Sequence, residues 1–490
     1  MPRPVFLAAA GALAFVLAFQ LWISPRNPPG FHHDEAAFAL NAYTIAHHLR
    51  DQNGALLPVL FPSYGDYKAA AFSYVLAPVF LVFGPSDGAA RALAAAFGIA
   101  AVALVGLLAR RRDGPWVAVC AACLAGLTPW LFQLGRVAYD TSAFPAAVVL
   151  LLFAVDAWAR PRFSLPRSVF VGAALAALTY AYGAGRLLAP LLAAALVVFA
   201  RFVPWRSLAA AWLAYAALLV PLAAYRLRHP HGLTARYRQT TFVQPGMKLG
   251  HVVSRAAGNY LGDLDPWRWL VSGDHKPYVD VWGAPQLLAV PVALAALGVV
   301  EIVRRRRHER FWLYALLAYL LSPVPAALTA DRHDALRLSA MPACLAVLAI
   351  PGLKALTRAP RPALAALATV LALATLAEWG FFVHVYSSRG QASRATVFEV
   401  GVPALVARGL AGGRTIYVDH DDAYALTMGQ WYAVTHGLPA ARVVRLPDGG
   451  VPPKGAMVLG RTQSCDYVCD QLAEADSFWL ARAVGPRPAG

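Results

Sequence analysis

Two adjacent acids, Asp34 and Glu35, follow the first apolar segment of the chain and a Pro-rich stretch at residues 25–30. A carboxylate within hydrogen-bond reach of a hydroxyl takes its proton as the oxygen attacks, which contributes about 10² to 10⁴ in rate. The same acids also suit the start of a helix over residues 35–49, because acids favour the positive end of the helix dipole. The two interpretations stay open from these residues alone, and the first predicts a base close to a membrane surface.

Other polar and charged residues stand in short segments between apolar runs. They are Tyr64, Asp66 and Lys68 in SYGDYK, Arg91 before an apolar run, Arg136 in GRVAYD, Arg186 after YGAG, Asp274 and His275 in SGDHK, and His333 and Arg337 in DRHDALR. Lys and Arg stabilise the charge that develops on a departing phosphate. Each Arg alone also suits contact with lipid headgroups, so the prediction of an anion-binding site rests on their coincidence.

Two patterns bear on metals and redox chemistry. His32 and His33 are adjacent, and adjacent histidines do not easily share one ion. Cys120 and Cys123 lie in an apolar run without a second pair, which argues against a zinc site. The sequence predicts no cofactor and leaves a divalent metal open without indicating one. Near the C-terminus, the spacing of residues 465 and 469 permits a short-loop disulfide and equally permits two free thiols.

The composition favours a membrane protein: 59% of the residues are hydrophobic and 14% are charged, against about one quarter charged in soluble domains. A helix of about 20 apolar residues crosses a bilayer. About eleven such helices are expected, near residues 4–23, 89–109, 114–132, 141–158, 168–183, 186–203, 207–225, 285–303, 311–329, 336–353 and 362–385. The fold class is therefore an all-α polytopic membrane protein.

Basic residues set the expected orientation. The net charge is +17, and much of it lies in five short loops at residues 110–112, 160–167, 201–206, 304–310 and 354–361. The positive-inside rule predicts that this side is cytoplasmic. The Arg residues are then expected to contact membrane lipids, and no nucleic-acid partner is expected. The apolar stretch 69–84 is too short for a span and is expected to lie on the outer surface.

The outer side then holds the long loops 24–88 and 226–284 of a membrane core at residues 1–386. The tail, residues 387–490, changes character. Residues 414–419 and 455–460 are expected to be strands, and residues 422–436 a helix. The sequence thus predicts a small α/β domain outside the membrane.

The ordered set of segments resembles the membrane glycosyltransferases of the C-type fold, in particular the superfamily of protein O-mannosyltransferases and lipid A aminoarabinose transferases. HHDEA is similar to the family's acidic dyad, GDYKAAAFSYVLAPVFLVFG to its lysine-containing stretch, and TPWLFQLGR to its SPW...SR element. DGAARALAAAFG, YLGDLDPWRWLVSGDHK and LTADRHDALR resemble further outer segments. Three alanines at residues 69–71 replace the family's prolines, and the tail matches no motif of the family.

The resemblance implies an inverting, single-displacement transfer of a monosaccharide from a polyprenyl-phosphate donor to an envelope acceptor, with Asp34 as general base and Glu35 beside it. Lys68, Arg91, Arg136 and Arg337 would bind the donor phosphate. The remaining candidates would contact substrate: Tyr64, Asp66, Arg186, Asp274, His275 and His333. It also implies a bacterial inner membrane, with the site and the tail facing the periplasm. The alternatives are a transporter or flippase of an anionic or lipid-linked precursor and a scaffold that uses the tail to bind a partner.

Overall fold

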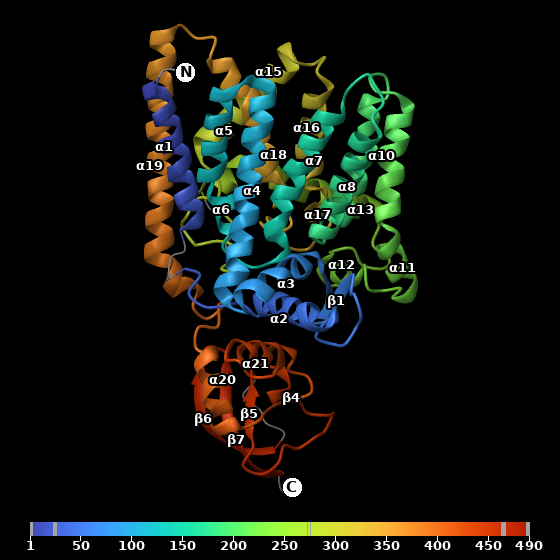
Figure 1. The fold of residues 1–490 in the computed structure, drawn as a ribbon, viewed down its shortest axis with the longest axis vertical. Coiled ribbons are helices and arrows are strands. Elements are labelled where there is room, and N and C mark those ends of the chain that lie inside the picture. Colours follow the sequence, from blue (N-terminus) through green and yellow to red (C-terminus); the bar gives the residue numbers. More distant parts are fainter. Residues whose placement is uncertain (1–2, 23–26, 272, 275, 462–466, 487–490) are drawn as a thin grey trace.

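The computed structural model describes residues 3–22, 27–271, 273–274, 276–461 and 467–486 of the 490-residue chain. A bundle of helices forms the larger part, and a small sheet domain lies beyond one end of it (Figure 1). The bundle consists of α1 (Arg3–Leu21), α4 (Asp87–Asp113), α5 (Pro115–Leu127), α6 (Pro129–Leu134), η1 (Asp140–Ala143), α7 (Phe144–Trp158), α8 (Leu165–Ala181), α9 (Gly185–Ala195), η2 (Leu196–Phe199), α10 (Trp205–Leu218), α11 (Val220–Arg228), α15 (Ala289–Arg305), α16 (Arg310–Leu321), α17 (Val324–Ala327), α18 (Ala340–Leu356) and α19 (Arg361–Arg394).

Each of the eleven predicted apolar segments overlaps at least one of these helices. By length and composition, three described segments suit a membrane crossing, Asp87–Asp113, Asp140–Trp158 and Pro362–Arg394, and the bent pair α10 and α11 makes a fourth. The protein is therefore a polytopic helical membrane protein, and the number of crossings stays a prediction.

Small residues let α15 and α18 pack closely. A Cβ atom added at Gly298 would lie 1.9 Å from the carbonyl oxygen of Leu348, and one at Gly352 would lie 2.1 Å from that of Leu294. Because lipid tails are as apolar as the side chains, helices in a bilayer gain stability mainly from such close packing. The pair forms part of one buried apolar cluster that runs through the bundle.

Ion pairs join the basic loops at the end of the bundle that points away from the sheet domain (Figure 1). Arg306 pairs with Asp113 at 2.7 Å and Arg358 with Glu301 at 2.6 Å. These contacts connect three of the five basic loops, as expected if they share one side of the membrane.

The opposite end carries shorter elements that include both long loops. They are α2 (His33–His48), β1 (Leu60–Ser63), β2 (Asp66–Ala69), α3 (Ala71–Phe83), α12 (Ala235–Thr240), α13 (Leu249–Leu264) and α14 (Pro266–Val271). Helices α2 and α3 lie across the end of the bundle in Figure 1, and β1 pairs with β2 as a hairpin. This placement of α3 agrees with the expected surface position of the stretch 69–84.

The tail forms the sheet domain. Its elements are α20 (Val402–Leu410), η3 (Ala411–Gly413), β3 (Ile416–Val418), α21 (Ala423–Thr435), η4 (Ala440–Arg442), β4 (Val443–Arg445), β5 (Met457–Gly460), β6 (Tyr467–Ala475) and β7 (Phe478–Pro486). The strand order is β4-β3-β5-β7-β6, with β3 parallel to β4 and β5. The two predicted strands and the predicted helix are confirmed. The expected boundary at residue 386 falls inside α19, and Cys465 lies outside the described residues.

The sheet domain and the first long loop share one apolar core. A single buried cluster includes Phe31 and Phe38 of the loop region and Phe398, Trp431 and Ile416 of the tail. Burial of apolar surface stabilises a fold by about 25 cal/mol per Å². The shared core therefore holds the tail against α2 and α3, so that the tail and the first long loop form one structure.

Candidate active site

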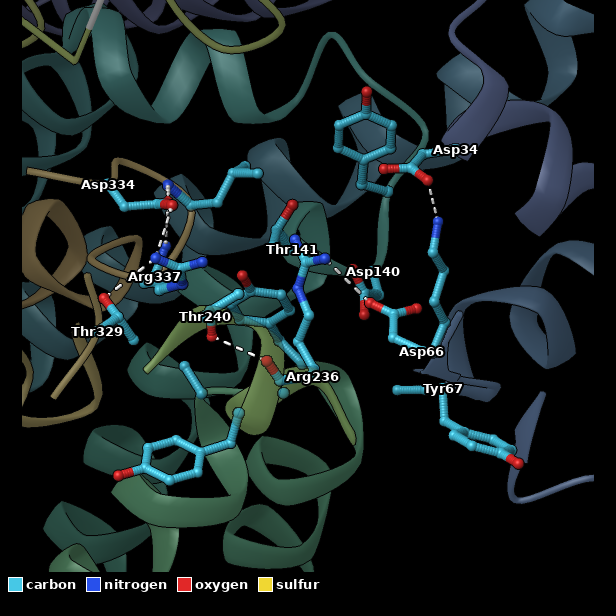
Figure 2. Close-up of a pocket in the computed structure, with 18 of the residues that line it drawn as sticks. Asp34, Asp66, Tyr67, Asp140, Thr141, Arg236, Thr240, Thr329, Asp334 and Arg337 are labelled. Carbon is cyan, nitrogen blue, oxygen red and sulfur yellow. Dashed lines mark hydrogen bonds and ion pairs between the residues drawn. The ribbon is translucent and has the colours of Figure 1, made fainter. Parts of the chain in front are cut away.

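A cavity of about 590 Å³ lies at the end of the bundle that faces the sheet domain. It is bordered by α2, β2, η1, the start of α9, α12 and the turn before α18. Six predicted site residues line it: Asp34, Tyr64, Asp66, Lys68, Arg186 and Arg337. Figure 2 shows Asp34, Asp66 and Asp140 on one side of it and Asp334 and Arg337 on the other.

Asp34 and Lys68 form an ion pair at the cavity wall. Asp34 is the second residue of α2, so the capping of that helix positions it: the His32 side chain accepts a hydrogen bond from the Asp34 amide at 3.1 Å. Burial disfavours ionisation, but the Lys68 ammonium stabilises the carboxylate and holds the pKa of Asp34 well below its ordinary value. About a third of the Asp34 side chain, 34%, stays accessible. An ionised, accessible carboxylate therefore faces the cavity.

Most cations of the cavity are paired with acids. Arg236 contacts Asp66 at 3.1 Å, and Lys276 contacts Asp334 at 2.7 Å. Arg337 contacts Asp334 at 3.2 Å. Burial opposes ionisation of Asp334, but its two cationic neighbours hold its pKa below the ordinary value.

Arg186 differs from these cations. Its guanidinium donates a 3.4 Å hydrogen bond to the carbonyl oxygen of Leu233, and no described acid lies within 4.0 Å of it. A bidentate guanidinium without a carboxylate partner matches a phosphate oxygen pair. Among the described residues of the cavity, Arg186 is thus the cation most available to an anionic ligand.

The structure separates the two adjacent acids. Glu35 is completely buried, and its carboxylate accepts hydrogen bonds from Arg91 at 2.7 and 2.9 Å and from the backbone amides of His32 at 3.0 Å and Ala138 at 2.9 Å. Neither Glu35 nor Arg91 lines the cavity. The pair instead ties the start of α2 to α4 and to the segment after α6, which fixes the position of Asp34.

Three other predicted site residues also lie outside the cavity lining. Arg136 is buried and donates hydrogen bonds to the carbonyl oxygens of Gln20 and Trp22 at the end of α1. Asp274 accepts a 2.8 Å hydrogen bond from the Ala335 amide. His333 lies 3.3 Å from Asp263, and its side chain is 18% exposed. Asp274 and His333 thereby hold the turn that presents Asp334 and Arg337. His275 lies outside the described residues.

Sequence reasoning did not single out four cavity residues: Arg236, Lys276, Asp334 and Tyr424. The first two belong to the basic excess of the loop 226–284, and that excess was the available signal. Asp334 stands inside DRHDALR, three residues before Arg337. Tyr424 had no signal, because it comes from the tail.

His32, His33 and Asp34 form a group whose ligand atoms all lie within 4.8 Å of one another, a spacing that suits a metal ion. One atom of each already has a protein partner: His32 Nδ1 accepts from the Asp34 amide, His33 Nδ1 lies 2.8 Å from Glu399, and Asp34 pairs with Lys68. A metal ion at this group would use Nε2 of the two imidazoles and would compete with Lys68 for the carboxylate of Asp34.

No known protein family and no curated protein matches this sequence. Solved structures do. ArnT from Cupriavidus metallidurans, a lipid A aminoarabinose transferase, was solved bound to undecaprenyl phosphate; it has a TM-score of 0.62 and 13% identity over 99% of this chain and 100% of its own. The archaeal oligosaccharyltransferase AglB from Archaeoglobus fulgidus, in complex with an inhibitory peptide and a dolichol-phosphate, has a TM-score of 0.51 and 14% identity over 88% of this chain and 64% of its own. The chain therefore has the C-type fold of these membrane glycosyltransferases, which confirms the resemblance found in its sequence.

Proposed function

We propose that the protein transfers a monosaccharide from a polyprenyl-phosphate donor to an envelope acceptor at the outer face of a bacterial inner membrane. One observation carries the proposal: an ionised, accessible Asp34 shares its cavity with five cations at the end of a membrane bundle, namely Lys68, Arg186, Arg236, Lys276 and Arg337. The C-type fold supports it, because its solved examples ArnT and AglB bind undecaprenyl phosphate and a dolichol-phosphate, respectively.

The reaction is a single displacement. Asp34 takes the proton of an acceptor hydroxyl as its oxygen forms a bond to the anomeric carbon. The bond between that carbon and the phosphate oxygen breaks, and the polyprenyl phosphate leaves with the electron pair. Attack opposite the leaving group inverts the anomeric configuration. Arg186 binds the phosphate, and its charge is worth more as negative charge accumulates there.

Lys68 links the two halves of the site. In this structure its ammonium pairs with Asp34, which keeps Asp34 ionised but weakly basic. A donor phosphate beside Lys68 would share that positive charge and would make Asp34 more basic. Donor binding thus activates the base.

The cavity position favours surface chemistry over transport. Transporters place substrate near the bilayer midplane between broken helices. Here α2, α12 and Tyr424 of the sheet domain border the cavity at the end of the bundle. The acceptor can therefore be an envelope lipid, glycan or protein that approaches from outside.

The test is label transfer by purified protein in nanodiscs, with a panel of radiolabelled polyprenyl-phosphate sugars and an extract of envelope acceptors. Asp34→Asn should lower transfer by about 10² to 10⁴. Asp448→Asn, which changes an exposed loop acid of the sheet domain, is the matched control and should transfer normally. Transfer by Asp34→Asn at the wild-type rate would refute the assignment of the base, and no transfer from any donor by the wild type would refute the activity.

A further inference from the structure

Two residues of the sheet domain contact His33, the neighbour of Asp34. The buried Glu399 places Oε1 2.8 Å from His33 Nδ1, and the Tyr424 ring meets the imidazole edge to face with centroids 4.6 Å apart. Burial lowers the pKa of His33 to about 2 and raises the pKa of Glu399 to about 9. Both directions favour the neutral forms, so the 2.8 Å contact is a hydrogen bond between buried neutral groups rather than an ion pair.

The same domain also holds the hairpin that carries Lys68. Tyr64, between β1 and β2, stacks on Tyr424 with centroids 4.2 Å apart and an interplanar angle of 1°. The Lys68 ammonium lies 5.0 Å from the Tyr64 centroid, and the Arg461 guanidinium lies 4.3 Å from the Tyr424 centroid. A cation over an aromatic face contributes about 0.5 to 2 kcal/mol. Lys68, Tyr64, Tyr424 and Arg461 thus form a continuous column from the catalytic pair into the sheet domain.

Tyr64 adds a direct link to the first turn of α2. Its hydroxyl donates a 2.9 Å hydrogen bond to the carbonyl oxygen of His33, and its own backbone adopts a positive φ of 50°. Non-glycine residues in that region are held there by their surroundings. The stacked Tyr424 ring is one such restraint.

The sheet topology explains why these side chains meet the cavity. Tyr424 follows β3, and Arg461 follows β5, so both lie at the carboxyl ends of parallel strands. The chain leaves β3 for β4 on one side and then returns to β5 on the other, which makes this edge a topological switch point. Open α/β sheets present functional residues at such a point. Asp422 joins the two strand ends, because it caps α21 and accepts a 2.7 Å hydrogen bond from the Arg461 amide.

We propose that Tyr424, Glu399 and Arg461 are positioning residues of the active site, which hold His33 and Tyr64 so that Asp34 and Lys68 keep their paired geometry. The sheet domain is then part of the catalytic apparatus. This inference rests on the proposed function, since it assigns the three residues to the base and the lysine of that reaction.

The test asks whether transfer depends on the aromatic ring of Tyr424 or only on the volume of its side chain. Tyr424→Leu removes the ring that meets His33 and Tyr64, and misplacement of reacting groups by about 1 Å costs up to about 10²-fold in rate. We expect transfer to fall about 10- to 100-fold in Tyr424→Leu and less than about threefold in Tyr424→Phe, which keeps the ring. Tyr417→Leu is the matched control, because Tyr417 packs against the other apolar cluster of the same sheet. It should transfer normally.

Two readouts separate positioning from loss of fold. The affinity for undecaprenyl phosphate, used as the probe, should fall less than about threefold and so much less than transfer, because Tyr424→Leu displaces Lys68 but leaves Arg186 in place. The acid limb of the pH profile should move upward in Tyr424→Leu, because a displaced Lys68 no longer lowers the pKa of Asp34. The titratable groups around Asp34 are Lys68 from β2 and the two histidines at the start of α2, together with Tyr64, Asp66, Tyr139 and Asp140, each of which interacts electrostatically with the Asp34 charge. A merely destabilised domain would not move that limb.

Glu399 and Arg461 give independent variants. Glu399→Gln should retain most of the transfer, because the amide can still hydrogen-bond to His33 Nδ1, whereas Glu399→Ala should lose activity. Arg461→Gln should lower transfer, and Arg445→Gln, an exposed arginine at the end of β4, should not. If Tyr424→Leu fails to fold, Arg461→Gln decides the question.

The failure of this inference differs from the failure of the function. If the wild type transfers and both Tyr424→Leu and Arg461→Gln match it, the positioning role is refuted and the transferase stands. If the wild type transfers nothing, hydrogen exchange measured by mass spectrometry decides. Faster exchange of residues 60–69 in Tyr424→Leu than in Tyr417→Leu would support positioning, and equal exchange would refute it.

Discussion

Replacing Glu35 with Gln should destabilise the protein more than the equivalent change at Asp34 beside it. Glu35 is completely buried against Arg91, whose side chain is 14% exposed. Removing one partner of a buried ion pair costs about 3 to 5 kcal/mol, because the other charge stays buried without compensation. That range lowers the ratio of folded to unfolded protein by about 10² to 4 × 10³. The two backbone amides that Glu35 accepts from, at His32 and Ala138, also lose a charged acceptor.

The assay is a thermal unfolding scan of each variant in the same detergent, beside label transfer at a temperature where all variants remain folded. Glu35→Gln should unfold at a clearly lower midpoint than the wild type. Asp34→Asn should lose transfer, and its midpoint should fall less than that of Glu35→Gln, because the Asp34 side chain is 34% accessible and water can reach the pair, whereas Glu35 is completely buried. A Glu35→Gln protein with the wild-type midpoint and no transfer would refute the reasoning, since Glu35 would then act on substrate.

Three further outcomes follow from the site and the bundle. Arg186→Gln should weaken the binding of undecaprenyl phosphate about 10- to 100-fold, because a charge-assisted hydrogen bond is lost. Arg236→Gln is the control: Arg236 is already paired with an acid, so this variant should change the affinity less than about threefold. Titration of the lipid into nanodisc-bound protein measures both affinities. Because the pKa of Asp34 is depressed in the folded protein, Asp34 stays ionised as the pH falls through the ordinary carboxyl range, and wild-type transfer should persist there. Lys68→Met removes the stabilising charge, so the acid limb of the pH profile of transfer should move to higher pH. Gly298→Val should lower the thermal midpoint, because the added side chain meets backbone of α18.

The sequence was informative wherever local pattern determines structure. Apolar length identified the helical segments, and the basic loops gave the common side that ion pairs such as Arg306 with Asp113 support. It also brought Asp34 and Lys68 to one site. Hydropathy and loop charge placed both in the first long loop, and the family resemblance assigned both to one site; their contact across 34 residues could not be predicted from periodicity, which does not say how a loop folds back on itself.

The roles of individual residues were harder to predict, since burial depends on the tertiary structure. Asp34 and Glu35 are equivalent in the sequence, but α2 turns one toward the cavity and the other into the bundle, because helical neighbours point about 100° apart. Arg136 likewise appears as one more outer cation and instead binds carbonyl oxygens at the end of α1. Tyr424 was invisible because its approach to His33 depends on the docking of a domain that matches no motif.

The apolar cluster shared by α2, α3 and the sheet domain sets an order of assembly. His33 and Glu399 are 366 residues apart in the chain, and Asn27 and Arg394 are 367 residues apart. At a synthesis rate of about 5 to 20 residues per second, the second partner emerges roughly 20 to 70 s after the first. During that time Phe31, which stacks on Trp431 of the sheet domain with ring centroids 5.8 Å apart, lacks that partner. The part of the first long loop that packs on the tail is therefore completed only after the whole bundle has been made, and until then its apolar surface is open to proteases and chaperones.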